Sequence, residues 1–259
     1  MKNKNYISIL ITNYNKEVFL KKTLHAACSQ NFKNYEIILF DDCSTDNSVE
    51  IIKKFKKVKL ISNKKKKRKT GPLNQINGII HCFKKSKGDI ILLLDGDDIF
   101  KKNKLKNINQ FFKGNKKLNS VFDLPVNNFD QFTIKNKSNK YSIWSSIFPT
   151  SCISSKRNFF FSFLKNIDKE SFPHLEIDAR FSIFAKFYMN EYNILNKKLT
   201  FYNYDQKGIT ANIKKYSRIW WIRRSEAFAY LRVIMKKRKM LFTFSFDYYI
   251  TSFLKFLLK

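Results

Sequence analysis

The chain has 259 residues, of which 44% are hydrophobic, and a formal net charge of +31. This apolar share is enough for a buried core and excludes a chain that is disordered throughout. The positive charge favours contact with polyanions such as nucleic acid, anionic lipid or phosphorylated substrates. The four cysteines are scattered without a C-x-x-C pair, which argues against a zinc site and against a disulfide framework.

Strands and helices alternate in the first hundred residues. Short apolar runs predict buried strands, and apolar residues at helical spacing predict the helices between them. The expected strands are residues 7–12, 35–40, 58–62 and 90–94, and the expected helices are residues 17–29, 49–55 and 72–85. This order is typical of the α/β class with a parallel, doubly wound sheet.

Polar clusters follow three of these strands, at residues 12–15, 41–42 and 95–98. In doubly wound sheets ligands bind outside the carboxyl ends of the strands. The third cluster contains Asp95, Asp97 and Asp98, whose charges repel one another unless a cation compensates them. Hard divalent cations prefer such oxygen ligands. The cluster therefore predicts a Mg²⁺ or Mn²⁺ site and phosphate chemistry.

The second half of the chain has a weaker pattern. Helices are expected at residues 103–112 and 178–188, and strands at residues 121–132, 141–148 and 199–204. Residues 216–239 predict a basic amphipathic helical stretch, and residues 240–258 are mostly aromatic and aliphatic. The last segment is about long enough to span a bilayer, but its charged residues favour a position in the membrane interface.

We therefore expect a domain over residues 1–215, with a nucleotide-binding half (1–112) and an acceptor-binding half (113–215). Residues 216–259 would form a tail that binds anionic membrane. The alternative is a tail that packs on the domain or on a second subunit.

Three segments carry a family resemblance. The run ISILITNYN at residues 7–15, the run ILFDDCSTD at residues 38–46 and the run LDGDD at residues 94–98 resemble motifs of the family 2 glycosyltransferases in order and spacing. The resemblance implies a GT-A fold, a Rossmann-like and mainly parallel sheet. It also implies an inverting enzyme that moves a sugar from a nucleotide-diphosphate donor, a UDP-sugar by preference, to a glycan or lipid-linked acceptor.

The resemblance also assigns roles to individual residues. Asp42 would accept the ring N–H of the base, and Tyr14 would lie against its ring. The predicted nucleotide-binding residues are Thr12, Tyr14, Asp42 and Asp95, and the predicted metal-binding residues are Asp97 and Asp98. Which acid ligates the ion directly is left open, with Asp97 as the first choice.

Two regions depart from the family pattern. The family's arginine after the third strand has no clear equivalent, so Arg68, Lys69 and the later Lys207 are candidates for contact with the diphosphate; solvated loop charge is the alternative. Glu176 and Asp178 resemble the acidic pair that supplies the general base, but a residue separates them. Asp178 is the expected base and Glu176 the second choice; the alternative is a pair of acids that complements a helix dipole.

Two other functions compete with sugar transfer. A GT-A nucleotidyltransferase would normally begin with a glycine-rich loop, which is absent after Ile11. A nucleic-acid-binding module would explain the charge and the aromatic residues, but acids at the centre of a site repel phosphate backbones. We therefore expect a nucleotide-sugar transferase of cell-surface polysaccharide or lipopolysaccharide synthesis. Its expected location is the cytoplasmic face of the cell membrane, bound peripherally.

Overall fold

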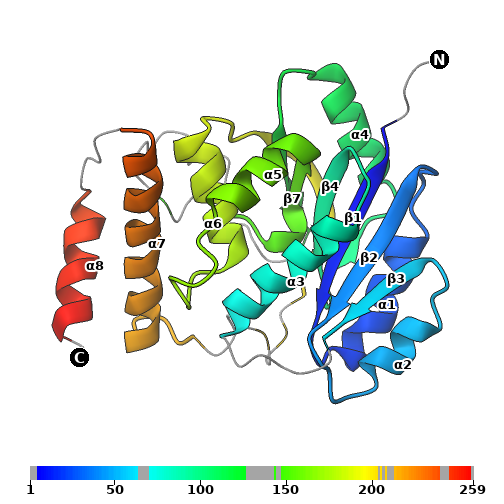
Figure 1. Cartoon of the computed structure of the whole chain (residues 1–259), viewed down its shortest axis with the longest axis horizontal. Helices are drawn as coiled ribbons and strands as arrows, with labels where there is room; N and C mark the ends of the chain where they lie inside the picture. Colours follow the sequence, from blue (N-terminus) through cyan, green and yellow to red (C-terminus); the bar gives the residue numbers. More distant parts are fainter. Residues whose placement is uncertain are drawn as a thin grey trace.

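The computed structural model describes residues 5–63, 70–126, 143, 147–203, 205, 208, 213–239 and 245–257. Its first half contains four parallel strands and the helices that connect them (Figure 1). These elements are β1 (Ile7–Asn13), α1 (Glu17–Cys28), β2 (Tyr35–Asp41), α2 (Ser48–Lys53), β3 (Val58–Ser62), α3 (Gly71–Lys85) and β4 (Ile90–Asp95). Each of the seven elements overlaps the range expected from the sequence, because apolar periodicity is strong here.

One eight-stranded sheet has the order β3-β2-β1-β4-β7-β6-β8-β5. The second half contributes β5 (Ile99–Phe100), α4 (Lys104–Gly114), β6 (Ser120–Pro125), β7 (Ile153–Lys156), α5 (Arg157–Asn166), α6 (Ile177–Ile183) and β8 (Ile194–Phe201). A 3-10 turn at Thr150–Cys152 precedes β7, and a π-helical turn at Phe184–Tyr188 follows α6. β7 runs antiparallel to both β4 and β6, whereas β6 and β8 are parallel. The sheet is thus mixed but mainly parallel.

Successive residues of β1 point to opposite faces of the sheet and belong to two different hydrophobic clusters. Leu10 packs with Ile38 of β2 and Ile79 of α3, whereas Ile9 packs on the other face with Leu24 of α1. All five side chains are almost fully buried. The strands are therefore held between two helical layers, so their carboxyl ends are the part of the sheet that remains available to a ligand.

The second half differs from expectation at several elements. The strand expected at residues 121–132 ends at Pro125, and most of residues 127–146 lie outside the described chain. β7 and α5 were not predicted at all. β7 is four residues of sequence ISSK, without an apolar run, and α5 places phenylalanines at three consecutive positions, which hides its helical period. The last strand begins at Ile194, earlier than expected, and ends at Phe201.

The predicted tail contains two helices, α7 (Arg218–Lys237) and α8 (Phe246–Leu257). α7 lies against the body of the protein, and α8 lies on its outer side (Figure 1). Phe228, Tyr230 and Leu231 of α7 are buried in the same hydrophobic cluster as α3, α5 and α6. The predicted boundary at residue 215 therefore separates α7 from a core that it helps to form. Among the described helices, none has the length and apolar character needed to cross a membrane.

A buried ion pair joins α4 to the sheet. Lys104 at the start of α4 and Asp123 in β6 are completely buried, with 2.5 Å between Lys104 Nζ and Asp123 Oδ1. The same ammonium donates to the carbonyl oxygen of Ser151 at 2.7 Å and to the hydroxyl oxygen of Thr200 at 2.6 Å. Every hydrogen of the ammonium thus has an acceptor, which a buried charge requires.

Replacing Lys104 with methionine should lower the free energy of unfolding by ~3–5 kcal/mol, because Asp123 is left buried without a counter-charge. Urea unfolding followed by circular dichroism measures the change. Lys53→Met is the matched control, since its pair with Glu50 is mostly exposed and should contribute much less. Equal losses of unfolding free energy in the two variants would show that the buried pair stabilises the fold no more than the exposed one.

Candidate active site

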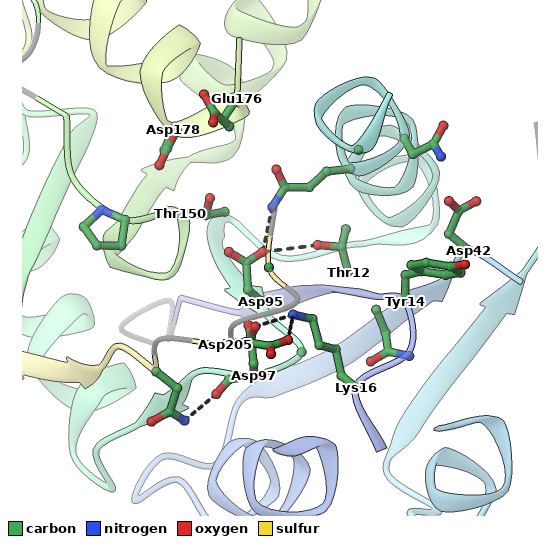
Figure 2. Close-up of a pocket in the computed structure, with 18 of the residues that line it drawn as sticks. Thr12, Tyr14, Lys16, Asp42, Asp95, Asp97, Thr150, Glu176, Asp178 and Asp205 are labelled. Atoms are coloured by element: carbon green, nitrogen blue, oxygen red, sulfur yellow. Dashed lines mark hydrogen bonds and ion pairs between the residues drawn. The ribbon is translucent and has the colours of Figure 1, made fainter. Parts of the chain in front are cut away.

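A pocket of about 340 Å³ opens at the carboxyl ends of β1, β2 and β4. Its lining includes residues from both halves of the chain, as Figure 2 shows. Seven of the predicted site residues line it: Thr12, Tyr14, Asp42, Asp95, Asp97, Glu176 and Asp178. The three polar clusters that follow the strands therefore converge as the sequence predicted, and the acids of the second half face the same cavity.

Tyr14 and Asp42 form one end of the pocket (Figure 2). Tyr14 is 40% exposed, so its ring remains accessible to a flat ligand. Asn63, which follows β3, donates through Nδ2 to Oδ1 of Asp42 at 3.2 Å. The preceding Asp41 points into the protein, where it accepts hydrogen bonds from Asn13 and Ser44 at 2.6–2.9 Å. Of the two adjacent acids, only Asp42 is therefore placed to meet a ligand.

Asp95 lies in the middle of the pocket. Its Oδ1 accepts a hydrogen bond from the Thr12 hydroxyl at 3.3 Å and another from Gln75 Nε2 at 2.8 Å. Burial and the nearby Asp97 carboxylate raise the pKa of Asp95 to about 6. Gly96 is required here by close approach, since a Cβ at this position would lie 2.7 Å from Asn13 Oδ1. The turn thus holds two carboxylates close together at the end of β4.

A lysine neutralises part of this charge. Lys16 Nζ lies 2.5 Å from Asp97 Oδ2 and 2.6 Å from Asp205 Oδ2 (Figure 2). Burial lowers the pKa of Lys16, but the two carboxylates outweigh this effect and the net shift is upward. Neither Lys16 nor Asp205 was predicted. The chain has 51 lysines and arginines, so nothing in the sequence marked this one.

Asp98 lies away from the pocket. Its Oδ2 accepts from the Ser151 hydroxyl at 2.6 Å, and its Oδ1 accepts from the backbone N–H of Asn203 at 2.9 Å. The side chain is buried and absent from the pocket lining. Ser151 Oγ also accepts the backbone N–H of Asp95 at 3.0 Å. Asp98 was predicted to be a metal ligand. The geometry instead indicates that it stabilises the turn that carries Asp95 and Asp97.

Glu176 and Asp178 lie at the start of α6, across the pocket from the end of β4 (Figure 2). Arg223 of α7 donates through Nε to Oε2 of Glu176 at 2.6 Å, so Glu176 is engaged in an ion pair. Burial and the neighbouring Glu176 raise the pKa of Asp178 to about 7. A carboxylate that titrates near neutral pH is suited to accept a proton from a hydroxyl.

The loop before α6 is organised by Arg180. This side chain is completely buried, and its guanidinium donates to the backbone carbonyl oxygens of four residues between 168 and 175, at 2.5–2.9 Å. α7 adds a second support, because Glu226 accepts the backbone N–H of His174 at 2.8 Å. The position of Glu176 and Asp178 thus depends on contacts with both α6 and α7. The predicted diphosphate contacts Arg68, Lys69 and Lys207 lie outside the described residues.

The pocket carries oxygen donors that a divalent cation could use. In the described part of the chain, no group of three or more His, Cys, Asp or Glu side chains is arranged to hold a metal ion alone. Mg²⁺ is usually held by one or two carboxylates together with substrate phosphates and water. Asp97 and Asp205 already hold one cation, the Lys16 ammonium, between them. Their oxygen donors therefore suit Mg²⁺ or Mn²⁺ in the presence of a phosphate-bearing ligand.

Comparison with known proteins identifies the family. The family model described as "Glycosyl transferase family 2" matches residues 8–189, which is more than half of the chain. The chain belongs to glycosyl transferase family 2. The match covers the elements that build the pocket from β1 to α6, and it confirms the predicted family and its transferase class.

Individual relatives match over shorter stretches. The chain is 36% identical over 111 residues to the Escherichia coli protein "UDP-Glc:alpha-D-GlcNAc-diphosphoundecaprenol beta-1,3-glucosyltransferase WfaP", which is 42% of this chain and 42% of WfaP. In three further curated relatives the matched stretch spans only 33–39% of their length.

Two solved structures resemble the whole described fold. Staphylococcus aureus TarS (residues 1–349) in complex with UDP-GlcNAc has a TM-score of 0.65 at 16% identity, and the alignment covers 98% of this chain and 71% of that one. The mannosyltransferase PcManGT of Pyrobaculum calidifontis, solved with GDP-Man and Mn²⁺, has a TM-score of 0.64 at 14% identity, with 99% and 70% covered. The predicted α/β fold of the GT-A type is thereby confirmed.

Proposed function

We propose that this family 2 protein is an inverting glycosyltransferase that moves a sugar from a nucleotide-diphosphate donor, a UDP-sugar by preference, to a hydroxyl of its acceptor. The observation that carries the proposal is the convergence of Tyr14, Asp42, Asp97 and Asp178 on one pocket. The comparisons support it, since TarS was solved with UDP-GlcNAc. A nucleotidyltransferase or a nucleic-acid-binding module would not explain why Asp178, at the start of α6, faces this pocket.

The pocket would bind the donor along its length. Tyr14 would lie against the base, and Asp42 would accept a ring N–H. Asp95, held by Thr12 and Gln75, would face the ribose. This order would place the diphosphate beside Asp97, with the sugar between Asp97 and Asp178.

Transfer then needs a base and a stabilised leaving group. Asp178 would take the proton of the acceptor hydroxyl as the oxygen attacks the anomeric carbon, and the single displacement inverts that centre. Asp97 and Asp205 would hold Mg²⁺ or Mn²⁺, which when bound supplies positive charge to the leaving diphosphate. Lys16, which pairs with Asp97 in this structure, would add a further positive charge near the diphosphate. Glu176, paired with Arg223, would hold the loop rather than take the proton.

The acceptor we propose is a glycan or lipid-linked saccharide of cell-surface polysaccharide or lipopolysaccharide synthesis. The name of WfaP, which specifies a diphosphoundecaprenol acceptor, supports this class. The high positive charge of the chain supports peripheral contact with anionic lipid at the inner face of the cell membrane.

Donor binding provides the direct test. Asp42→Ala should raise the dissociation constant for UDP, measured by calorimetry with Mn²⁺ present, by ~10-fold or more, because a hydrogen bond to a charged group contributes ~1.5–3 kcal/mol. Glu50→Ala, at an exposed acid of α2, is the matched control and should leave the affinity unchanged. UDP affinity that is equal in both variants, or binding of GDP in preference to UDP, would contradict the proposed base pocket.

A further inference from the structure

The outer helix α8 exposes a continuous apolar stripe. Residues 246, 249, 250, 253, 256 and 257 recur at helical spacing, so they share one face of the helix. Their exposed fractions are Phe246 81%, Tyr249 59%, Ile250 36%, Phe253 62%, Phe256 67% and Leu257 59%. An apolar surface that is contiguous over three turns is unusual for a protein surface and marks a site of interaction.

The opposite face of α8 is fixed to α7. Arg224 Nη2 lies 2.6 Å from both carboxylate oxygens of Asp247, and the Tyr248 ring packs edge-on against Phe228 at 5.5 Å. Thr251 is completely buried in this contact. The stripe is thus held outward by a defined interface, and α7 lies between α8 and the rest of the protein (Figure 1).

The charge around the apolar stripe indicates which kind of surface it binds. Residues 216–257 include nine lysines and arginines against two acids. Both acids are engaged within the protein, Asp247 with Arg224 and Glu226 with the backbone of His174. The cationic residues from 236 to 239, at the end of α7, are exposed, beyond the point where the start of α8 packs against Arg224 and Phe228. A second copy would bring like charges together, whereas an anionic surface would be attracted.

We propose that the exposed stripe of α8 inserts into the interfacial layer of an anionic bilayer, with the basic end of α7 against the headgroups. Twelve residues form a helix of about 18 Å, too short to cross the hydrocarbon core but suited to lie in its surface. Aromatic side chains settle at this depth, and each nearby cation strengthens the contact with anionic lipid. The surface would bring the active site to a lipid-linked acceptor, and in this respect the proposal rests on the proposed function.

Flotation of the full chain tests the surface. Vesicles of phosphatidylcholine mixed with phosphatidylglycerol should carry the protein, vesicles of phosphatidylcholine alone should carry much less, and added salt should weaken the contact. Phe253→Glu combined with Phe256→Glu should lower the bound fraction by about 10-fold, since it places charges where the helix meets lipid. Val18→Glu is the matched control, because Val18 is 76% exposed on α1 and belongs to the other end of the chain.

Two further measurements keep the outcomes distinct. Calorimetry with UDP and Mn²⁺ in each variant shows whether the pocket is intact, and sedimentation velocity gives the oligomeric state. Flotation of the double variant equal to wild type would overturn the proposal, as would a wild-type chain that does not float. A dimer that the double variant converts to monomer, with flotation unchanged, would assign the stripe to a second copy instead. A chain that floats but binds no nucleotide would refute the proposed function and would still support membrane binding by α8.

Discussion

Replacing Asp97 with asparagine should lower kcat by at least ~10²-fold while the protein still folds, because the leaving diphosphate would lose the charge stabilisation that we propose for this carboxylate. The affinity for Mn²⁺ in the presence of UDP, measured by electron paramagnetic resonance of the free ion, should weaken by at least ~10-fold. Asp97 is expected to have this effect because it lines the pocket and already binds a cation, the Lys16 ammonium at 2.5 Å.

Asp98→Asn, one residue away, separates metal binding from support of the turn. Asp98 is buried and engaged by Ser151 and Asn203. Its replacement should lower the melting temperature, whereas the Mn²⁺ affinity of the folded protein should stay close to that of wild type. The opposite result, normal Mn²⁺ binding in Asp97→Asn and loss in Asp98→Asn, would move the ion to Asp98 and require a rearrangement of the turn.

The second large effect is expected at Asp178. Asp178→Asn should reduce kcat by ~10²–10⁴-fold, the contribution of a well-placed general base, with the affinity for UDP unchanged. Glu176→Gln is the companion variant, since Glu176 pairs with Arg223 and should affect stability more than turnover. A kinetic defect confined to Glu176→Gln would place the base two residues earlier. An equal loss of UDP affinity in Asp178→Asn would make Asp178 a structural acid.

The pH dependence of turnover follows from the same residue. Burial and the neighbouring Glu176 raise the pKa of Asp178 to about 7. The base works only when it has lost its proton, so kcat should rise as the pH increases through about 7 and level off above it. A pH–rate profile at saturating donor measures this limb. The residual activity of Asp178→Asn should lack it, and a limb that persists unchanged would assign the titration to another group.

Sequence patterns predicted well which residues of the first half meet at the pocket, because these residues follow strands with strong apolar periodicity. Thr12, Asp42 and Asp95 each come directly after or at the end of such a strand, and parallel strands bring these ends together. The direction of a single side chain was not predictable in the same way. Asp98 differs from Asp97 only by one position in a turn, and a hydrogen bond from the distant Ser151 decides where it points.

The residues that sequence reasoning missed act across long stretches of chain. Lys16 meets Asp205, which is 189 positions away, and Arg223 meets Glu176, which is 47 positions away. Charged pairs of this kind leave no periodic signal, and a chain with many lysines and arginines offers too many possible partners. β7 and α5 were missed for a related reason. The short polar strand has no apolar run, and the three consecutive phenylalanines of the helix obscure its helical period.

The contact between Arg223 and Glu176 has a consequence for how the protein is made. Domains fold as units while the chain is synthesised from its N-terminus, so the strands whose ends line the pocket emerge first. Arg223 lies beyond residue 189, where the family match ends, and it leaves the ribosome after every strand of the sheet. Until α7 emerges, Glu176 lacks its counter-charge and the hydrophobic cluster lacks Phe228 and Tyr230. The strands whose ends line the pocket are therefore synthesised well before the helix that supplies the counter-charge of Glu176 and completes the hydrophobic cluster.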